Sequence, residues 1–362
     1  MIKATDLVKF FIKNNIFFFS GVPDSVLKFF LQELKSKKVK NITSVNEGSA
    51  IGISIGQYLK TKKLNVTYMQ NSGLGNAINP LISIADKNVY SIPLILLIGW
   101  RGKPGEKDEP QHITQGLNTK NFLTNLNIKF IELRDRKDLV KAKKLITYAK
   151  KNLKSIAFLI SKNILEGSKE KKINLGPKIN RYEFLEKLLF KIKRKDLIIS
   201  NTGYTSRELD TIIKKSQRHN QRAIYMVGGM GHSSSVSLGY SIKNKNKVFC
   251  IDGDGSMLMH LGALATCAQI GKKNFKYILL NNYCHESVGS QPTISKKINF
   301  QLLSKSLRFK NYIKITKKNE LDKKLTSFLN KQGPNFLEVA INTGTLKKLS
   351  RPTNLKNLIK KI

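Results

Sequence analysis

The chain has 362 residues, of which 40% are hydrophobic, and its 65 basic and 24 acidic side chains give a net charge of +41. This length and composition exclude a disordered or fibrous protein and leave room for two domains with buried cores. Apart from the amino terminus, the longest apolar run covers residues 92–99, which is far too short to span a bilayer. The apolar amino terminus lacks a small-residue cleavage site, so we expect neither a signal peptide nor a membrane partner.

The positive charge raises the possibility of a nucleic-acid partner. However, the lysines occur as pairs scattered over the whole chain, without zinc-finger spacing, an RGG tract or an RNA-binding aromatic motif. Scattered charges are typical of a solvated surface, so no nucleic-acid partner is expected, and a polyanion-binding face stays as the alternative. The three cysteines, Cys250, Cys267 and Cys284, include no CxxC pair, which favours reduced thiols in a cytoplasmic protein.

Short apolar runs alternate with helical patterns, which predicts an α/β fold with mostly parallel sheets covered by helices. In the first half, helices are expected near residues 24–34, 49–59, 77–85 and 138–150, and strands at 16–20, 42–45, 66–70, 92–99, 129–133 and 156–160. In the second half, strands are expected at 197–200, 223–227, 248–251, 277–280, 312–315 and 336–341. Residues 166–180 are polar and lysine-rich, like a linker. The pattern predicts two domains, residues 1–165 and 181–362, each with about six strands.

Two acids in this basic chain follow an expected strand in the segment CIDGDGS, residues 250–256. We expect the glycines to form a tight turn and an apolar helix to begin at Ser256. Main-chain N–H groups at such a turn can hold a phosphate, and Asp254 could join Mg²⁺ to that phosphate. A turn in which an aspartate caps the helix would have the same pattern. A spacer of 25 residues separates the GDG motif from Asn281 and Asn282, which follow the next expected strand.

The GDG motif, the spacer and the asparagine pair together resemble the diphosphate-binding segment of the thiamine-diphosphate-dependent 2-oxoacid decarboxylases. By this resemblance, the Asp254 carboxylate, the Asn282 side-chain oxygen and the main-chain carbonyl of Cys284 would bind Mg²⁺. The resemblance implies two thiamine-diphosphate-binding-fold domains, with the pyrimidine side in residues 1–165 and the diphosphate side in residues 181–362. The other residues expected to hold the diphosphate are Gly253, Gly255 and Ser256.

A second segment, SVNEGSAIGISIGQYL at residues 44–59, places Glu47 between an expected strand and an expected helix. In the resembling enzymes a carboxyl group at this place drives the aminopyrimidine to remove the thiazolium proton, and Glu47 matches it. An ordinary first-turn acid, favoured by the helix dipole, is the alternative. In the glycine-rich residues 226–240, Gly228 and Met230 match positions that contact the cofactor. A strand-to-helix turn and a core methionine would have the same pattern.

The resemblance also implies an assembly. In the family the cofactor lies between the pyrimidine-side domain of one subunit and the diphosphate-side domain of another. A homodimer or a dimer of dimers is therefore expected, with active sites at the subunit interface. Long members of the family carry a third domain between the two halves, whereas here about fifteen residues, 166–180, join them. The chain therefore resembles a compact subgroup.

Several segments are closely similar to phosphonopyruvate decarboxylases, with sulfopyruvate decarboxylases as the nearest relatives: residues 20–28, 68–81, 97–116 and 250–293. The similarity implies a small anionic 2-oxoacid as substrate. Arg101 and Lys103 lie in a loop that follows an expected strand and could bind its phosphonate or carboxylate. A surface ion pair is the alternative for Arg101.

Three further residues complete the predicted site. Asp24 and His112 match residues that transfer protons in related decarboxylases, and His285 is a candidate for substrate contact. A helix cap is the alternative for Asp24, and a loop-bracing donor is the alternative for His112. The function that the resemblance implies is non-oxidative decarboxylation of 3-phosphonopyruvate to phosphonoacetaldehyde and carbon dioxide in phosphonate biosynthesis. The alternatives are sulfopyruvate decarboxylation and polyanion binding by an inactive thiamine-enzyme fold.

Overall fold

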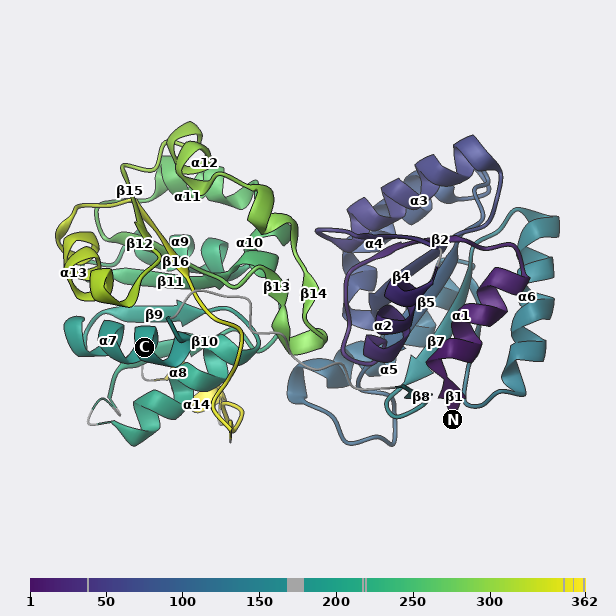
Figure 1. The fold of residues 1–362 in the computed structure, drawn as a ribbon, viewed down its shortest axis with the longest axis horizontal. Helices are drawn as coiled ribbons and strands as arrows, with labels where there is room; N and C mark the ends of the chain where they lie inside the picture. The colour runs from purple at the N-terminus through teal and green to yellow at the C-terminus, as the bar shows by residue number, and fades with distance from the viewer. Residues whose placement is uncertain are drawn as a thin grey trace. The chain divides into compact units, whose positions relative to one another are not determined.

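The computed structural model describes residues 1–37, 39–167, 179–216, 218, 220–347, 349–353, 355–360 and 362. The chain divides into two compact units, residues 1–171 and 172–362 (Figure 1). Most of the linker predicted at residues 166–180 lies outside the described residues. In the described part of the chain, none of the helices combines the length and the apolar character that crossing a membrane requires.

The first unit is built on a sheet of six parallel strands in the order β3-β2-β4-β5-β7-β6. Its strands are β2 (Phe18–Gly21), β3 (Lys40–Thr43), β4 (Val66–Gln70), β5 (Ile95–Trp100), β6 (Lys129–Glu132) and β7 (Ile156–Ser161). Every residue of β5 and β7 is buried, as expected for parallel strands covered on both faces. A separate parallel pair joins β1 (Ile2–Lys3) to β8 (Leu165–Glu166).

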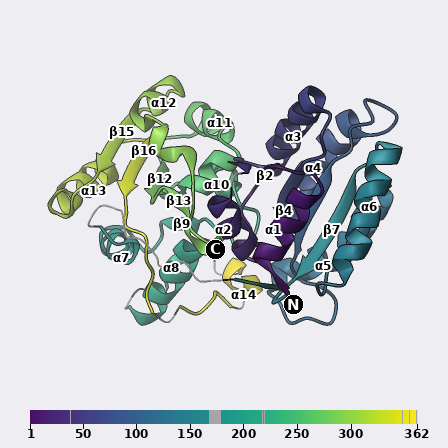
Figure 2. The ribbon, with the colours of Figure 1, turned by 45° about the vertical axis from the view of Figure 1, so that its right-hand side comes forward.

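Helices cover both faces of this sheet (Figure 2). Successive side chains of a strand point to opposite faces, so Leu97 of β5 joins one core cluster and Leu96 joins the other. The first cluster receives side chains from α1 (Ala4–Lys13), α2 (Lys28–Ser36) and α6 (Asp138–Asn152). The second receives them from α3 (Glu47–Thr61), α4 (Leu74–Pro80) and α5 (Pro110–Asn125).

The second unit also has a sheet of six parallel strands, in the order β10-β9-β11-β12-β16-β15. Its strands are β9 (Leu197–Ser200), β10 (Arg222–Tyr225), β11 (Val248–Gly253), β12 (Phe275–Asn281), β15 (Asn311–Ile315) and β16 (Asn335–Ala340). After β12, the short strands β13 (Cys284–His285) and β14 (Gln291–Pro292) form an antiparallel hairpin.

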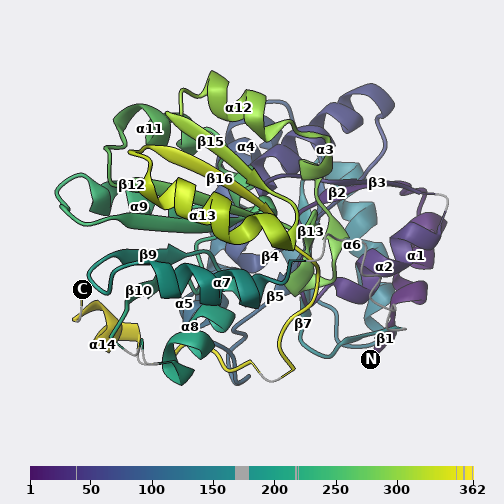
Figure 3. The ribbon, with the colours of Figure 1, turned by 60° about the vertical axis from the view of Figure 1, so that its left-hand side comes forward.

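Figure 3 shows α7 (Arg181–Lys191) and α13 (Leu321–Asn330) in front of this sheet, and both contribute to its larger core cluster. On the opposite face, Tyr240 of α9 packs against Leu197 and Ile199 of β9. The remaining helices are α8 (Tyr204–Lys215), α9 (Ser233–Ser241), α10 (Asp254–Met259), α11 (Ala263–Ile270), α12 (Phe300–Ser306) and α14 (Leu355–Ile359).

The two sheets share one topology. In each, the first strand in chain order lies between the second and the third: β2 between β3 and β4, and β9 between β10 and β11. The winding of the chain therefore reverses between the first and third strands. In open parallel sheets, ligands bind beyond the carboxyl ends of the strands at such a reversal. The fold itself thus predicts ligand sites after β2 and β4 and after β9 and β11.

The predicted fold class is confirmed, since both units are six-stranded parallel sheets covered by helices. Two helices differ from prediction at places that matter for function. The helix expected from residue 24 begins only at Lys28, because Asp24 first holds a turn. The helix expected from Ser256 begins earlier, at Asp254, and ends at Met259. His260 interrupts it with non-helical backbone angles (φ −134°, ψ 52°) before α11 begins.

Candidate active site

Glu47 is the first residue of α3, at the carboxyl edge of the first sheet. Asn46 caps this helix by accepting a hydrogen bond from Ser49 N at 2.8 Å. The Glu47 side chain is buried, and its Oε2 accepts a hydrogen bond from Asn76 Nδ2 at 2.8 Å. Burial raises the pKa of Glu47 above its ordinary value, although the bond from Asn76 acts in the opposite direction. A carboxyl group of this kind can exchange a proton with a ring nitrogen at neutral pH.

Close packing holds the Glu47 carboxyl in place. Gly73, which follows β4, lies against it, and a Cβ on Gly73 would fall 2.5 Å from Oε1 of Glu47. Since real Cβ atoms do not approach other atoms so closely, an alanine here would push the Glu47 carboxyl out of its position. The end of β4 thus supplies both the space for the carboxyl and, through Asn76, its hydrogen-bond donor.

Asp24 follows β2 and is 1% exposed. Its Oδ2 accepts hydrogen bonds from Val26 N at 2.8 Å and Leu27 N at 3.1 Å, whereas its Oδ1 has no hydrogen-bond partner among the described residues. Burial raises the pKa of Asp24 to about 6, despite these N–H donors and the nearby charge of Arg101. Asp24 is therefore not the N-cap of α2, which is Leu27; its Oδ2 holds the turn before the helix, and its Oδ1 is left available to a ligand.

The Arg101 guanidinium, at the end of β5, is already engaged in ion pairs. It donates to the Asp108 carboxylate from Nε at 2.8 Å and from Nη2 at 2.6 Å. It also donates to Glu109 at 3.2 Å and to the Ser25 hydroxyl at 3.1 Å. A substrate anion could reach Arg101 only through the remaining Nη1 hydrogen or by displacing Glu109, the more exposed of the two acids.

Lys103 lies in the same loop and is held by residues of the neighbouring strands. Its Nζ contacts the Glu132 carboxylate and lies 5.7 Å from the centre of the Trp100 ring. Lys120 of α5 lies over the same ring at 5.1 Å. Lys103 therefore braces the loop that follows β5 in addition to contributing positive charge to it.

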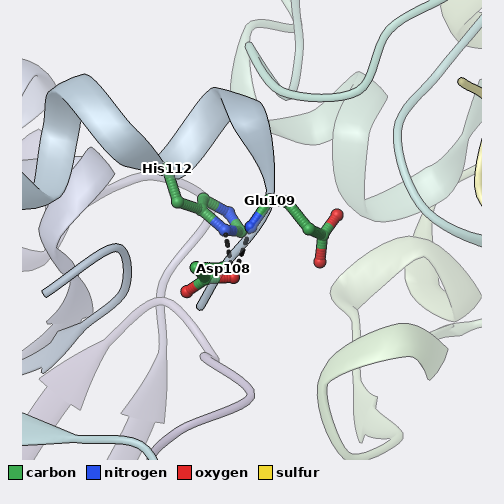
Figure 4. Close-up of side chains that lie close together, drawn as sticks. All are labelled: Asp108, Glu109 and His112. Carbon is green, nitrogen blue, oxygen red and sulfur yellow. Dashed lines mark hydrogen bonds and ion pairs between the residues drawn. The ribbon is translucent and has the colours of Figure 1, made fainter. Parts of the chain in front are cut away.

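His112, in the first turn of α5, is oriented by Asp108, as Figure 4 shows. Its Nδ1 lies 3.1 Å from Asp108 Oδ1. Because an ionised carboxylate only accepts hydrogen bonds, Nδ1 carries the hydrogen of the neutral ring and Nε2 is the basic nitrogen. Burial lowers the pKa of His112, and the charge of Arg101 lowers it further. The neutral ring can thus accept a proton at Nε2.

Asp108, Glu109 and His112 also form a candidate metal cluster, with one ligand atom from each within 4.8 Å of the others. Asp108, however, already contacts the Arg101 guanidinium and lies 3.5 Å from Lys162 Nζ. Although burial acts to raise it, hydrogen bonds from Arg101, Gly102 N and His112 hold the pKa of Asp108 well below its ordinary range. Protein cations therefore fill the place that a metal would take.

In the second unit, Asp254 begins α10 directly after β11 and is 2% exposed. Its Oδ2 accepts hydrogen bonds from the hydroxyls of Thr293 and Ser295, the latter at 2.8 Å. Burial raises the pKa of Asp254 to about 6, while these hydroxyls act to lower it. The other acid of the motif, Asp252, accepts from the Tyr277 hydroxyl at 3.1 Å and so stabilises the turn. Asp254 is therefore the acid that faces the loop after β14.

The two glycines of the motif bring its backbone close to neighbouring polar groups. A Cβ on Gly253 would lie 2.9 Å from Asn201 Nδ2, and one on Gly255 would lie 2.5 Å from the His285 ring. Asn201, directly after β9, is buried, and its Oδ1 has no partner among the described residues. Burial lowers the pKa of His285 to about 4, so its imidazole is neutral at pH 7. An open oxygen and a neutral imidazole thus line the turn after β11.

Gly228 and Met230 lie half-buried in the loop between β10 and α9. The neighbouring Gly231 N donates a hydrogen bond to Ser256 Oγ at 3.1 Å, which ties this loop to α10. Gly231 has a φ of +89°, and a Cβ there would lie 2.5 Å from the His260 ring, so glycine is required. The structure thus brings both predicted cofactor residues to the same sheet edge as the GDG motif.

Asn282 and Cys284 lie between β12 and the hairpin turn. The Asn282 Oδ1 accepts a hydrogen bond from Cys284 N at 3.2 Å, and its Nδ2 donates to Glu286 Oε2 at 3.1 Å. The neighbouring Asn281 Oδ1 accepts from Ser295 Oγ at 3.1 Å, the same hydroxyl that donates to the GDG acid. The loop thus gathers amide and hydroxyl oxygens beside a buried carboxylate.

This end of the second unit fits a diphosphate held through Mg²⁺. Carboxylate, amide and carbonyl oxygens are the hard ligands that Mg²⁺ prefers, and the Ser295 hydroxyl links the Asp254 carboxylate to the asparagine pair after β12. In a chain of net charge +41, this region concentrates buried acids: Glu208, Asp252, Asp254, Glu286 and Glu338. Arg181 pairs with two of them and Lys314 with a third. The surplus of buried acid favours a bound cation.

Four residues of this site were not singled out by sequence reasoning: Asn76, Asp108, Asn201 and Glu286. Three of them lie in segments that carry the family resemblance, at residues 68–81, 97–116 and 250–293. Asn201 directly follows an expected strand, where open sheets bind ligands, and this position was the available signal.

Comparison with known proteins agrees with the motifs. Residues 3–122 match the thiamine pyrophosphate enzyme N-terminal TPP binding domain, and residues 202–339 match the C-terminal TPP binding domain of these enzymes. A phosphonopyruvate decarboxylase from Streptomyces hygroscopicus is 30% identical over 372 residues, which cover 97% of this chain and 90% of that protein.

Two further relatives are sulfopyruvate decarboxylases. The enzyme of Methanosarcina acetivorans is 27% identical over 338 residues, which cover 87% of this chain and 85% of that protein. The beta subunit from Methanothermobacter thermautotrophicus is 34% identical over 166 residues, which cover 46% of this chain and 84% of that protein. The motifs, the domain matches and these relatives lead to one conclusion: the chain belongs to the family of thiamine pyrophosphate-dependent decarboxylases.

Proposed function

We propose that this decarboxylase converts 3-phosphonopyruvate to phosphonoacetaldehyde and carbon dioxide, with thiamine diphosphate and Mg²⁺ as cofactors. One observation carries the proposal. The chain has a buried carboxyl, Glu47, at the carboxyl end of one sheet, and it has Asp254 with a pair of asparagines at the carboxyl end of the other. The Streptomyces relative, which matches 97% of the chain, supports the substrate. When bound, thiamine diphosphate would supply the electron sink as carbon dioxide leaves.

In the second unit, we assign Mg²⁺ binding to the Asp254 carboxylate, Asn282 Oδ1 and the carbonyl of Cys284. Main-chain N–H groups of the turn after β11 would hold the diphosphate, and Gly228 and Met230 would contact the pyrimidine. The residues assigned to the turn are Gly253, Gly255 and Ser256. His285, whose ring lies against this turn, would contact the substrate.

In the first unit, Glu47 would hold a proton at its carboxyl for exchange with the pyrimidine ring. Asp24, through Oδ1, and His112, through Nε2, would move protons to and from the substrate carbon. Arg101 and Lys103 would attract the phosphonate, and their ion pairs with acids would hold them in place meanwhile. The phosphonate would reach Arg101 through its remaining Nη1 hydrogen or by displacing Glu109.

Sulfopyruvate is the second candidate substrate, and the two sulfopyruvate decarboxylase relatives favour it. Both substrates end in a tetrahedral anion that the cations after β5 could attract. A phosphonate takes up a second negative charge near neutral pH, as a phosphate does, whereas a sulfonate does not. Binding of phosphonopyruvate should therefore strengthen as the pH rises through the second pKa of the phosphonate. An inactive, polyanion-binding protein would need neither Glu47 nor the oxygen ligands of the second unit.

Three further properties belong to this proposal. The reaction would serve phosphonate biosynthesis, by removing carbon dioxide from the product of a step that forms a carbon–phosphorus bond. A cytoplasmic location is supported by the cysteines, since no disulfide joins them in the described residues. The proposed assembly is a homodimer or dimer of dimers with active sites shared between subunits.

Subunit complementation tests the shared site. Glu47→Gln and Asp254→Asn proteins would be mixed under conditions that allow subunit exchange, at cofactor and Mg²⁺ concentrations too low for either variant to be active alone. If each site combines Glu47 of one chain with Asp254 of another, half of the dimers carry one intact site, and activity returns to about a quarter of the wild-type value. Mixing that restores no activity, despite exchange shown by mass spectrometry, would place each site within one chain.

The proposed reaction is tested by measuring release of carbon dioxide and aldehyde from 3-phosphonopyruvate, with sulfopyruvate and pyruvate measured in parallel. Thiamine diphosphate and Mg²⁺ are added together and separately. We expect turnover of phosphonopyruvate that requires both cofactors. Preferred turnover of sulfopyruvate would replace the substrate while keeping the reaction, and cofactor-loaded protein that turns over none of the three acids would contradict the proposal.

A further inference from the structure

We infer that Glu286 is a positioning residue for the metal ligand Asn282, because its carboxylate fixes the amide with Oδ1 turned toward the cation. This inference rests on the proposed Mg²⁺ site. It adds a residue that does not itself touch the cation or the cofactor.

The orientation of the Asn282 amide is defined by two independent contacts. Nδ2 donates to Glu286 Oε2 at 3.1 Å, and Oδ1 accepts from Cys284 N at 3.2 Å. An ionised carboxylate can only accept a hydrogen bond and a main-chain N–H can only donate one. A flipped amide would therefore set an oxygen against the carboxylate and an NH₂ group against the N–H. Both contacts favour the orientation that leaves the oxygen on the side of the Cys284 backbone.

The Glu286 carboxylate is itself held firmly. Arg181 Nη1 donates to its Oε2 at 3.0 Å, and Gly344 N donates to its Oε1. Arg181 is fixed in turn, since its Nε donates to Glu208 Oε2 at 2.9 Å and its Nη2 to the Gly344 carbonyl at 3.0 Å. The three charged side chains are at most 5% exposed. A carboxylate with this many fixed partners can impose an orientation on its neighbour.

The charge of this network also suits a cation nearby. Arg181 is one positive charge between two carboxylates, so the buried group carries an excess of negative charge beside Asn282. The neighbouring asparagine shows the same arrangement, because Asn281 Nδ2 donates to the buried Glu338 at 3.2 Å while Tyr283 N donates to its Oδ1. Each amide of the pair is thus oriented by a carboxylate on one side and a main-chain N–H on the other.

The test is the Mg²⁺ concentration that half-saturates thiamine diphosphate binding, measured by equilibrium dialysis without any substrate. Loss of a residue that supports a metal ligand typically lowers metal affinity about 10- to 100-fold. We expect Glu286→Ala to raise the Mg²⁺ requirement at least about tenfold. Glu208→Ala is the matched control, since it also removes one carboxylate from Arg181 but leaves the contact between Asn282 and Glu286. Because it removes one negative charge without freeing the Asn282 amide, it should raise the Mg²⁺ requirement clearly less than Glu286→Ala does.

Glu286→Gln keeps the test decisive if the alanine variant does not fold. Glutamine preserves the volume and one acceptor oxygen for Asn282, but a neutral acceptor forms a bond about half as strong. The Mg²⁺ requirement should then rise about threefold, half of the tenfold effect on a logarithmic scale. Equal effects of the Glu286 and Glu208 variants, or no effect at Glu286, would overturn the inference alone. If the wild-type chain binds thiamine diphosphate equally tightly with and without Mg²⁺, the proposed metal site is wrong as well.

Discussion

The two units of this protein have the same strand order but carry different functional side chains at the carboxyl ends of their strands. In the first unit, Glu47 and Asp24 are separate buried carboxyls with raised pKa values. In the second unit, the Asp254 carboxylate accepts hydrogen bonds from two hydroxyls, and one of these, Ser295, also donates to the Asn281 amide oxygen. The comparison teaches that the topology supplies two similar positions, while the residues at the strand ends decide what each position does.

One pair of residues makes the difference concrete. Asp24 follows the first strand of the first sheet, and Asn201 follows the first strand of the second. Each is buried and keeps one side-chain oxygen without a partner among the described residues. The carboxyl can release or accept a proton, whereas the amide can only form hydrogen bonds. This difference agrees with the proposed roles, which are proton transfer in the first unit and cofactor anchoring in the second.

The largest effect is expected for Glu47→Gln, which removes the proton-exchanging group from the first unit. The amide cannot take up the proton, so turnover should fall about a thousandfold or more, in the upper part of the range for general acid–base groups. Affinity for thiamine diphosphate should change little, because the anchoring residues are intact. Steady-state rates and equilibrium dialysis measure the two quantities. A large loss of affinity in this variant would assign anchoring to the first unit too.

Asp254→Asn tests the second unit. The substitution keeps the shape of the side chain and removes its charge, so Mg²⁺-dependent affinity for thiamine diphosphate should fall about 100-fold. Asp252→Asn is a neighbouring control, since that side chain stabilises the turn through Tyr277. The control should lower thermal stability more than cofactor affinity. If Asp254→Asn binds the cofactor as tightly as wild type, the metal assignment is wrong.

Asp24→Asn should lower the activity of the protein and should raise its stability at high pH only. The pKa of Asp24 is raised from 3.8 to about 6 in the folded chain, so folding favours the protonated form. The free energy of unfolding therefore has its full value below pH 3.8 and falls as the pH rises through about 6. A pKa raised by about two units corresponds to a loss of about 3 kcal/mol. Asparagine avoids this loss, and the variant should be more stable than wild type at pH 8 but not at pH 4.

Urea unfolding at the two pH values measures that difference. The same variant should lose activity, because the amide cannot carry the proton. An equal change in unfolding free energy at pH 4 and pH 8 would show that the Asp24 carboxyl does not titrate as described.

The smallest effects are expected from two matched glycine substitutions. Gly73→Ala would press on the Glu47 carboxyl, and Gly255→Ala would press on the His285 ring, each with a Cβ 2.5 Å from the nearest atom. Each should cost about 1–3 kcal/mol of stability, as overpacking does. If the units divide their tasks, Gly73→Ala lowers turnover more and Gly255→Ala lowers cofactor affinity more. The reverse pattern in the same two assays would contradict that division.

The fold and the ends of the strands that carry the candidate site could be predicted from the sequence, because apolar periodicity and glycine turns are local signals. Glu47 and Asp254 were singled out because each stands at the start of a helix in a segment that resembles the thiamine enzymes. The helix break at His260 was missed because the apolar pattern continues through it.

The partners of these residues could not be predicted in the same way. Asn76 reaches Glu47 across 29 positions, and Arg181 reaches Glu286 across 105 positions. Such contacts depend on which strands become neighbours, and no local pattern records that. Arg101 shows the opposite case: its partner Asp108 is only seven residues away, but the turn that joins them includes Gly102 with a φ of +66°. The ion pair between Arg101 and Asp108 therefore depends on the folded conformation of the loop, which the sequence alone did not show.

The most direct test of the account compares Glu47→Gln and Asp254→Asn in two assays on the same preparations. The assays are the affinity for thiamine diphosphate in Mg²⁺ and the rate of carbon dioxide release from 3-phosphonopyruvate at saturating cofactor. We predict that Glu47→Gln binds the cofactor like wild type but scarcely turns over, and that Asp254→Asn binds weakly and regains part of its rate as cofactor and Mg²⁺ are raised. Two variants that fail in the same assay, to the same extent, would contradict the division of tasks between the two units.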